Sequence, residues 1–101
     1  MGDSSQVPEK VFQTRLLVRL REIPGTYWFK SNDRTTAGIP DIIGCVAGVF
    51  FALELKTKSK VSPIQAYHLR KIDDAAGQAF VVTPKNVAQV LEFIRKIAAQ
   101  S

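Results

Sequence analysis

The sequence predicts an α/β protein in which helices and strands follow one another in the order αβββαβα. Three observations support this prediction. Apolar residues recur at helical spacing toward both ends of the chain, segments rich in β-branched and aromatic residues lie between them, and turn-forming residues separate the segments. The 101 residues leave room for one domain, spanning 1–101, because single domains commonly contain about 100–150 residues.

The first helix is expected to begin near Pro8, after a loose polar tail over residues 1–6. Proline fits the first turn of a helix, and Glu9 complements the positive end of the helix dipole. Apolar residues recur at helical spacing at Phe12, Leu16, Leu20 and Ile23. We expect the helix to end at Pro24-Gly25.

Three strands are expected next, over residues 26–31, 39–43 and 49–56. A polar loop over 32–38 separates the first two, and a turn over 44–48 precedes the third. The first strand contains the aromatic residues Tyr27, Trp28 and Phe29. Aromatic side chains can stack on nucleic-acid bases, but in a strand we expect them in the core.

The third strand carries apolar residues on both of its faces. Side chains alternate across a strand, which places Phe50, Ala52, Glu54 and Lys56 on one face and Phe51, Leu53 and Leu55 on the other. This pattern predicts a buried strand. In such a strand, Glu54 and Lys56 are costly unless they pair with each other or bind a metal.

A second helix is expected from Pro63 to about Ala76, with Ser62 as its N-cap and Gln65 placed to close a capping box. Gly77 is expected to end this helix. Its apolar face would be Ile64, Leu69, Ile72 and Ala76. A fourth strand over 78–83 precedes a C-terminal helix, whose expected buried face is Val87, Val90, Leu91, Ile94 and Ile97.

Composition limits the kind of protein and the kind of partner. Lys and Arg number 14 against 9 Asp and Glu, and the formal net charge of +5 suits a polyanion. The single cysteine, Cys45, cannot form an internal disulfide, and we expect it to be buried in a protein of a reducing compartment. No apolar run approaches the roughly 20 residues that span a bilayer. We therefore expect a cytoplasmic protein without a membrane partner.

Two short motifs predict a metal site for phosphodiester hydrolysis. Gly38-Ile39-Pro40-Asp41 places a carboxylate at the start of one strand, and Glu54 precedes Lys56 by two residues on the next. Carboxylate oxygens are preferred ligands of Mg²⁺ or Mn²⁺, and a lysine can orient the attacking water or offset phosphate charge. The backbone carbonyl of Leu55 is a further candidate ligand.

These residues resemble the VRR-NUC branch of the PD-(D/E)xK nuclease superfamily. The resemblance rests on Gly38-Ile39-Pro40-Asp41, Glu54-Leu55-Lys56-Thr57, Ser62-Pro63-Ile64-Gln65 and the element order. It implies a restriction-endonuclease-like αβββαβ core, with a mixed four-stranded sheet flanked by helices and a C-terminal helix. It also implies a metal-dependent endonuclease for branched DNA, similar to Holliday junction resolvases. Stand-alone viral and bacterial members of this branch are dimeric, so a homodimer is expected.

The same resemblance implies that Glu9 joins the metal site and that Gln65 serves in catalysis. Simpler interpretations remain open for each residue. Glu9 can merely favour the helix start, and Gln65 can merely close the capping box. Asp41 can belong to a turn, and Glu54 with Lys56 can form a structural ion pair. The only histidine, His68, leaves zinc sites and histidine-based triads without support.

Basic residues are expected to form a rim around the site and to bind phosphates without reading sequence. They are Lys30, Arg34, Lys58, Lys60, Arg70 and Lys71. A solvated run of charges is the simpler interpretation of any one of them. Two functions other than a nuclease stay open at this point, namely a non-catalytic DNA-binding module that keeps the nuclease fold and a purely structural protein.

Overall fold

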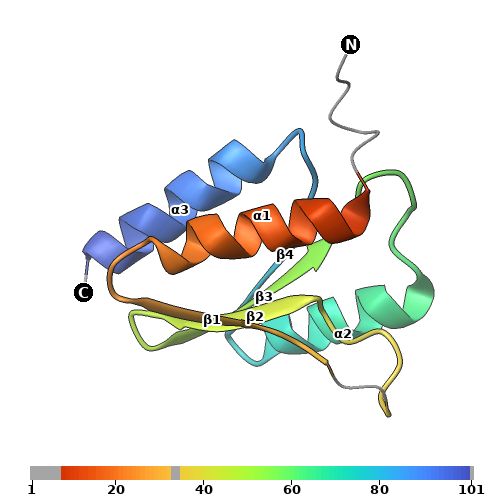
Figure 1. Cartoon of the computed structure of the whole chain (residues 1–101). Coiled ribbons are helices and arrows are strands. Elements are labelled where there is room, and N and C mark those ends of the chain that lie inside the picture. The colour runs from red at the N-terminus through yellow and green to blue at the C-terminus, as the bar shows by residue number, and fades with distance from the viewer. Residues whose placement is uncertain (1–7, 33–34, 101) are drawn as a thin grey trace.

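The computed structural model describes residues 8–32 and 35–100. The expected tail over 1–6 and Arg34 lie outside the described residues. The elements are α1 (Glu9–Arg21), β1 (Thr26–Lys30), β2 (Ile42–Val46), β3 (Val49–Leu55), α2 (Pro63–Asp74), β4 (Gln78–Val82) and α3 (Val87–Ala99). The predicted order αβββαβα is therefore confirmed (Figure 1).

The strands form one mixed sheet in the order β1-β2-β3-β4. β1, β2 and β3 are antiparallel neighbours, whereas β4 runs parallel to β3. Helices α1 and α3 lie on one side of the sheet and α2 lies on the other (Figure 1). α2 contacts β3 and β4. The coarse prediction of an α/β protein with a mixed four-stranded sheet flanked by helices is thus confirmed.

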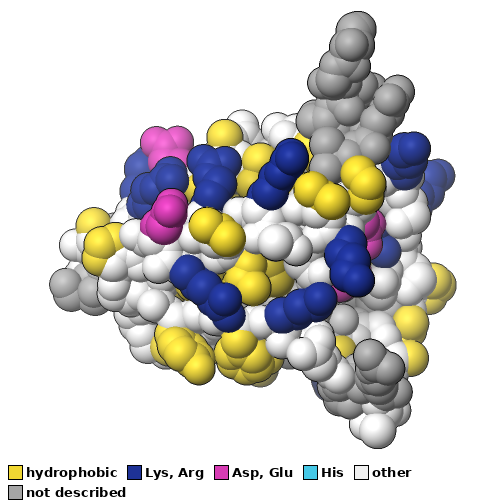
Figure 2. All heavy atoms as spheres, in the orientation of Figure 1, with side chains coloured by type: hydrophobic (Ala, Val, Ile, Leu, Met, Phe, Trp, Pro, Cys, Tyr) yellow, Lys and Arg dark blue, Asp and Glu magenta, His cyan; other side chains and the backbone are white. Residues whose placement is uncertain are grey.

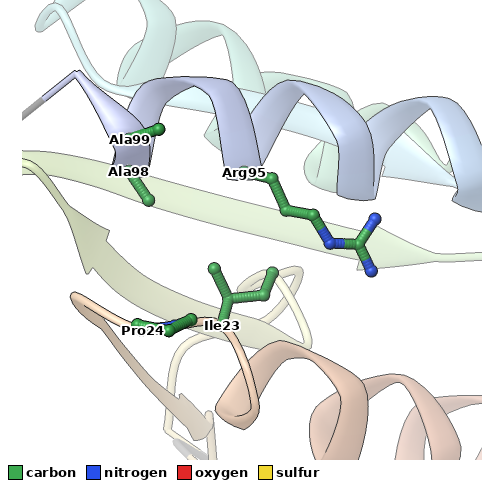
Figure 3. A pocket seen from close by; sticks show the side chains of 5 residues that line it. All are labelled: Ile23, Pro24, Arg95, Ala98 and Ala99. Atoms are coloured by element: carbon green, nitrogen blue, oxygen red, sulfur yellow. The ribbon is translucent and has the colours of Figure 1, made fainter.

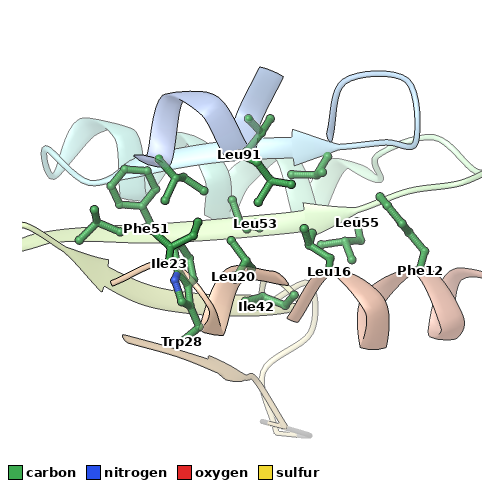
Figure 4. Packing of buried hydrophobic residues seen from close by; sticks show 14 residues of the cluster. Phe12, Leu16, Leu20, Ile23, Trp28, Ile42, Phe51, Leu53, Leu55 and Leu91 are labelled. Atoms are coloured by element: carbon green, nitrogen blue, oxygen red, sulfur yellow. The ribbon is translucent and has the colours of Figure 1, made fainter. Parts of the chain in front are cut away.

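The hydrophobic core lies between the sheet and the pair α1 and α3 (Figure 4). The predicted apolar face of the first helix is buried as expected, at Phe12, Leu16, Leu20 and Ile23. Phe51 of β3 is fully buried, and its ring packs edge-on against Trp28 and stacks with Phe80. Burying large apolar side chains is the main favourable term in folding, so this layer stabilises β3 inside the sheet.

β2 lies three residues later than predicted, because Gly44 is part of the strand and does not form a turn. Gly44 instead occupies the middle of β2, opposite Trp28. A Cβ at Gly44 would lie 2.3 Å from the carbonyl oxygen of Tyr27 and 2.4 Å from the Trp28 ring. The missing side chain therefore makes room for tryptophan. The true turn is Ala47-Gly48, where φ is 52° and 79°, and this geometry matches the twist of a tight hairpin.

The expectation that Tyr27, Phe29 and Cys45 are buried is wrong. All three side chains are exposed, and only Trp28 of the aromatic run belongs to the core. The reason is the placement of α2, whose sheet contacts are with β3 and β4. The β1 and β2 part of the same sheet face is left open.

The second helix begins as predicted and ends earlier. Ser62 and Gln65 form the expected capping box, and the helix stops at Asp74. Ala76, with φ of 71°, takes the left-handed position that glycine usually occupies after a helix. No residue of α2 is fully buried, contrary to the predicted apolar face, because this helix covers only one margin of the sheet.

The C-terminal helix matches its predicted pattern, with Val90, Leu91 and Ile94 buried. It begins at Val87, after a turn in which the Asn86 side chain accepts from the N–H of Thr83 and donates to the carbonyl of Val81. Among the helices in the described part of the chain, none is long and apolar enough to cross a membrane.

Candidate active site

The β2 and β3 pairing brings the two predicted carboxylates together. Ile42 pairs with Leu53 in the antiparallel register, so the preceding Asp41 lies opposite Glu54. Asp41 Oδ2 accepts a hydrogen bond from the Leu55 N–H at 2.8 Å. The Asp41 carbonyl accepts from the Ser31 N–H at 2.9 Å. Asp41 is therefore held from both neighbouring strands.

Glu54 is the buried charged residue of the described structure, with 2% of its surface exposed. Its Oε2 accepts a hydrogen bond from Gln65 Nε2 at 3.0 Å and lies 3.6 Å from Lys56 Nζ. Its Oε1 is buried and has no hydrogen-bond partner among the residues that the structure describes. An unsatisfied buried polar oxygen is costly, so this atom is the part of the site that needs an explanation.

Burial, together with the nearby Asp41 carboxylate and against the opposing effect of Lys56, raises the pKa of Glu54 from 4.5 to about 7. Removal from water disfavours the charged form of a carboxyl group, and a second carboxylate adds repulsion. Without a cation at the site, Glu54 is therefore partly protonated near pH 7. A bound cation would favour the charged form.

Gln65 joins the start of α2 to Glu54. Its Oε1 accepts from the Ser62 N–H at 2.9 Å and closes the capping box, while its Nε2 donates to Glu54. The two roles considered from the sequence, a helix cap and a site residue, are thus compatible in one side chain. The capping box fixes the rotamer of Gln65 and hence the direction from which Glu54 receives a hydrogen bond.

Lys56 is placed by the parallel pairing of β3 with β4. Its N–H donates to the Val82 carbonyl at 3.0 Å, and its side chain is 11% exposed. The side chain lies on the Glu54 face, as the alternation of the strand predicted. Because the ammonium keeps some access to solvent while it lies near Glu54, it can also reach a phosphate or a water molecule at the site.

The donors fit a hard divalent cation that keeps part of its hydration shell. Asp41 and Glu54 offer two carboxylates, and Glu54 Oε1 is unpartnered within the described residues. In an extended strand, the N–H and C=O of one residue point to the same edge, so the Leu55 carbonyl is directed toward the Asp41 side. Mg²⁺ commonly binds one or two carboxylates and retains several waters.

Glu9 does not complete a carboxylate cluster. No group of three or more His, Cys, Asp or Glu side chains in the described ranges is arranged to hold a metal ion. Glu9 stands in the first turn of α1, which in Figure 1 lies at the same end of the sheet as the end of β3. His68 is likewise outside the pair, with Nε2 3.0 Å from the Ala37 carbonyl oxygen.

The predicted basic residues are exposed wherever the structure describes them. These are Lys30, Lys58, Lys60, Arg70 and Lys71. The sequence interpretation missed a second basic group, on the outer face of α1, formed by Lys10, Arg15, Arg19 and Arg21. Their signal was present, since all four fall outside the apolar positions of that helix. Figure 2 shows Lys and Arg side chains spread widely over the face that presents α1.

The hollow between the C-terminal parts of α1 and α3 is not an alternative active site. It encloses about 350 Å³ and is lined by Ile23, Pro24, Arg95, Ala98 and Ala99 (Figure 3). Its lining has no acidic, nucleophilic or metal-binding side chain. This hollow therefore offers no chemistry that rivals the Asp41 and Glu54 pair.

Comparisons with known proteins give no independent assignment. No protein-family model and no curated protein matches the chain.

Proposed function

We propose that this protein is a divalent-metal-dependent endonuclease that hydrolyses phosphodiester bonds in branched DNA. The observation that carries the proposal is the buried Glu54 carboxylate, which lies opposite Asp41 and beside Lys56 and has one oxygen without a partner in the described structure. Perturbed carboxylates of this kind are concentrated at functional sites.

A structural ion pair alone accounts less well for this arrangement. The distance of 3.6 Å between Lys56 Nζ and Glu54 Oε2 is long for a buried pair. The pair leaves Oε1 unsatisfied, and it leaves a second carboxylate, Asp41, facing the first. Two facing carboxylates near one lysine cost stability. A metal ligand set explains why both are present.

Each residue has a distinct proposed role. Asp41 and Glu54 would hold Mg²⁺ or Mn²⁺, with the Leu55 carbonyl as a further ligand. A divalent cation supplies Lewis-acid stabilisation of negative charge and activation of water. Lys56 would orient the attacking water or offset charge on the scissile phosphate. Gln65 would position Glu54 through the bond to Oε2.

The fold and the charge are compatible with this function. The element order and the mixed sheet fit the restriction-endonuclease-like core that the VRR-NUC resemblance implies. The net charge of +5 and the exposed lysines and arginines suit a DNA backbone. A four-way junction of the Holliday type is one branched substrate within this proposal.

The decisive experiment is digestion of a panel of four-way junctions, flaps and forks with Mg²⁺ or Mn²⁺ and with EDTA. We expect metal-dependent cutting that Asp41→Ala abolishes. Asp73→Ala is the matched control, because Asp73 is an exposed aspartate on α2. DNA binding without cutting under all metal conditions would instead identify a non-catalytic DNA-binding module. If the protein neither binds nor cuts any DNA of the panel, both ideas are wrong.

A further inference from the structure

One face of the sheet presents aromatic side chains beside the carboxylates. Residues paired across antiparallel strands point to the same face. The register aligns two rows on the face that α2 leaves open at β1 and β2, namely Tyr27, Cys45 and Phe50 in the first and Phe29, Ile43 and Ala52 in the second. Asp41 and Glu54 continue this series as the next row.

The aromatic rows are open to solvent where α2 does not reach. Tyr27 is 67% exposed, Phe29 is 42% exposed and Phe50 is 46% exposed. The Tyr27 and Phe29 rings lie 6.0 Å apart between centroids and are tilted by 53°. Contiguous exposed aromatic side chains indicate a binding surface, since proteins seldom leave such a patch in water without use.

The patch leads directly into the candidate site. Phe29 precedes Ser31 by two residues, and the Ser31 N–H donates to the carbonyl of Asp41. Two residues along a strand span about 7 Å. A nucleic-acid strand that stacked a base on Phe29 would therefore carry its next phosphates toward Asp41 and Glu54.

A cation lies at the β1 edge of the same patch. Arg21 Nε donates to the Trp28 carbonyl at 3.3 Å, which places the guanidinium along the outer edge of β1. Lys30 is exposed at the end of the same edge strand, and its pairing with Ile42 places it on the opposite face from Phe29. Aromatic platforms bordered by cations are the usual means of binding single strands.

We propose that the open face of β1 and β2 binds unpaired nucleotides, and that the site cuts DNA next to them. The cutting rests on the proposed nuclease function, whereas the binding does not. A second copy of the chain is a poorer occupant. A protein seated flat on these rows would close the approach to Asp41 and Glu54, and a twofold contact would bring two cationic margins together.

Cys45 provides a direct test, because it is the only cysteine of the chain and lies in the middle of the first aromatic row. The rate at which Ellman's reagent labels it would be measured in EDTA, with oligothymidine, with a blunt duplex and without DNA. We expect oligothymidine to slow labelling several-fold at saturation and the duplex to slow it much less. Unchanged labelling with oligothymidine bound would overturn the proposal.

Substitutions test the stacking itself. Tyr27→Ala and Phe29→Ala are each expected to weaken oligothymidine binding about ten-fold, whereas Tyr27→Phe keeps the ring and the affinity. Val18→Ala is the control, because Val18 is an exposed apolar residue of α1. Thermal melting would verify that each variant is folded. Equal affinities for all four proteins and the wild type would overturn the proposal.

The outcomes separate this inference from the proposed function. Binding at this face without metal-dependent cutting would leave the inference standing and remove the nuclease assignment. Metal-dependent cutting without protection of Cys45 would support the nuclease assignment and overturn the inference. Labelling that slows with protein concentration alone, and not with oligothymidine, would identify a second copy as the occupant and overturn the inference.

Discussion

At the scale of single residues, Glu54 combines burial, a facing carboxylate and an unpartnered oxygen within the described structure. A group in this position makes folding depend on pH. The folded-state pKa of about 7 lies above the ordinary glutamate value of 4.5, so the folded protein binds more protons between these pH values. The free energy of unfolding should therefore be largest below about pH 4.5 for this group and should fall as pH rises toward 7.

The first prediction follows from that sign. In EDTA, the free energy of unfolding of the wild type should fall between pH 5 and pH 7.5 by an amount of order 1–3 kcal/mol attributable to Glu54. Glu54→Gln should lose this part of the pH dependence, because glutamine does not titrate. Urea denaturation at the two pH values measures it. Glu92→Gln, on the exposed surface of α3, is the control and should behave as the wild type.

The second prediction concerns Lys56. Lys56→Ala should lower the cleavage rate by roughly 100-fold or more, in the range lost when a proton-transfer or charge-stabilising group is removed. Mn²⁺ affinity, measured by calorimetry, should change much less, because Lys56 is not a metal ligand. Glu54→Ala should abolish both.

Lys85→Ala is the control, because Lys85 is an exposed lysine outside both the ion pair and the proposed DNA-binding residues. A Glu54→Ala protein that cuts at the wild-type rate and melts normally would remove the assignment of nuclease activity to this site.

The sequence predicted the residues that the strands bring together, and it did so through spacing. Asp41, Glu54 and Lys56 could be found because strand alternation and hairpin pairing are local rules. The exposure of Tyr27 and Cys45 could not be predicted from the sequence, because it depends on how far α2 extends over the sheet. That reach is a tertiary property with no signal near either residue.

At the scale of elements, the end of α2 departs from the usual chemistry. Ala76 adopts φ of 71°, although Gly77 follows it. Gly77 is required for a different reason, because a Cβ at this position would lie 2.8 Å from Ile72 Cγ2. Glycine at 77 therefore serves close packing, and the adjacent alanine takes the left-handed turn. The sequence therefore predicted the end of the helix in the right region, but the left-handed residue is Ala76 and not the expected Gly77.

The third prediction is that Ala76→Gly stabilises the protein by about 0.5–1 kcal/mol, since alanine is strained in the left-handed region and glycine is not. The melting temperature should rise accordingly. Ala75→Gly is the matched control, because Ala75 has φ of −88° and gains nothing from glycine. A lower melting temperature for Ala76→Gly than for Ala75→Gly would contradict the explanation.

At the scale of the whole molecule, the pairing order of the strands decides where the candidate site lies. An antiparallel β2 and β3 hairpin places Asp41 opposite Glu54, and the parallel β4 anchors Lys56 beside them. The element order was predictable from periodicity and turn residues. The position of β2 was not, because Gly44 gives the same local signal whether it turns the chain or admits the Trp28 ring.

The fourth prediction concerns the electrostatic contribution to DNA binding. Replacing Lys58 and Lys60 together with alanine should weaken binding to all sequences about equally. The slope of log affinity against log salt should fall by up to about 2, because fewer counterions are released. Fluorescence anisotropy at several salt concentrations measures both. Lys85 and Lys96, which are exposed before and on α3, form the control pair.

A changed sequence preference with an unchanged salt slope would mean that Lys58 and Lys60 contact bases, or do not contact DNA. An unchanged affinity would indicate that the basic group on α1, and not Lys58 and Lys60, contacts the phosphates. Replacing Arg15 and Arg19 together with alanine would then reduce the affinity for DNA more than replacing Lys58 and Lys60.

The last prediction is that the working unit is a homodimer. One pair of carboxylates cuts one strand, whereas resolving a symmetric four-way junction requires two coordinated cuts. The described part of the chain contains one such pair, so twofold symmetry is the simplest source of the second. Sedimentation and light scattering at micromolar concentration, with and without a junction, measure the state. A protein that stays monomeric in both conditions and still makes paired cuts would show that one site acts on both strands in turn.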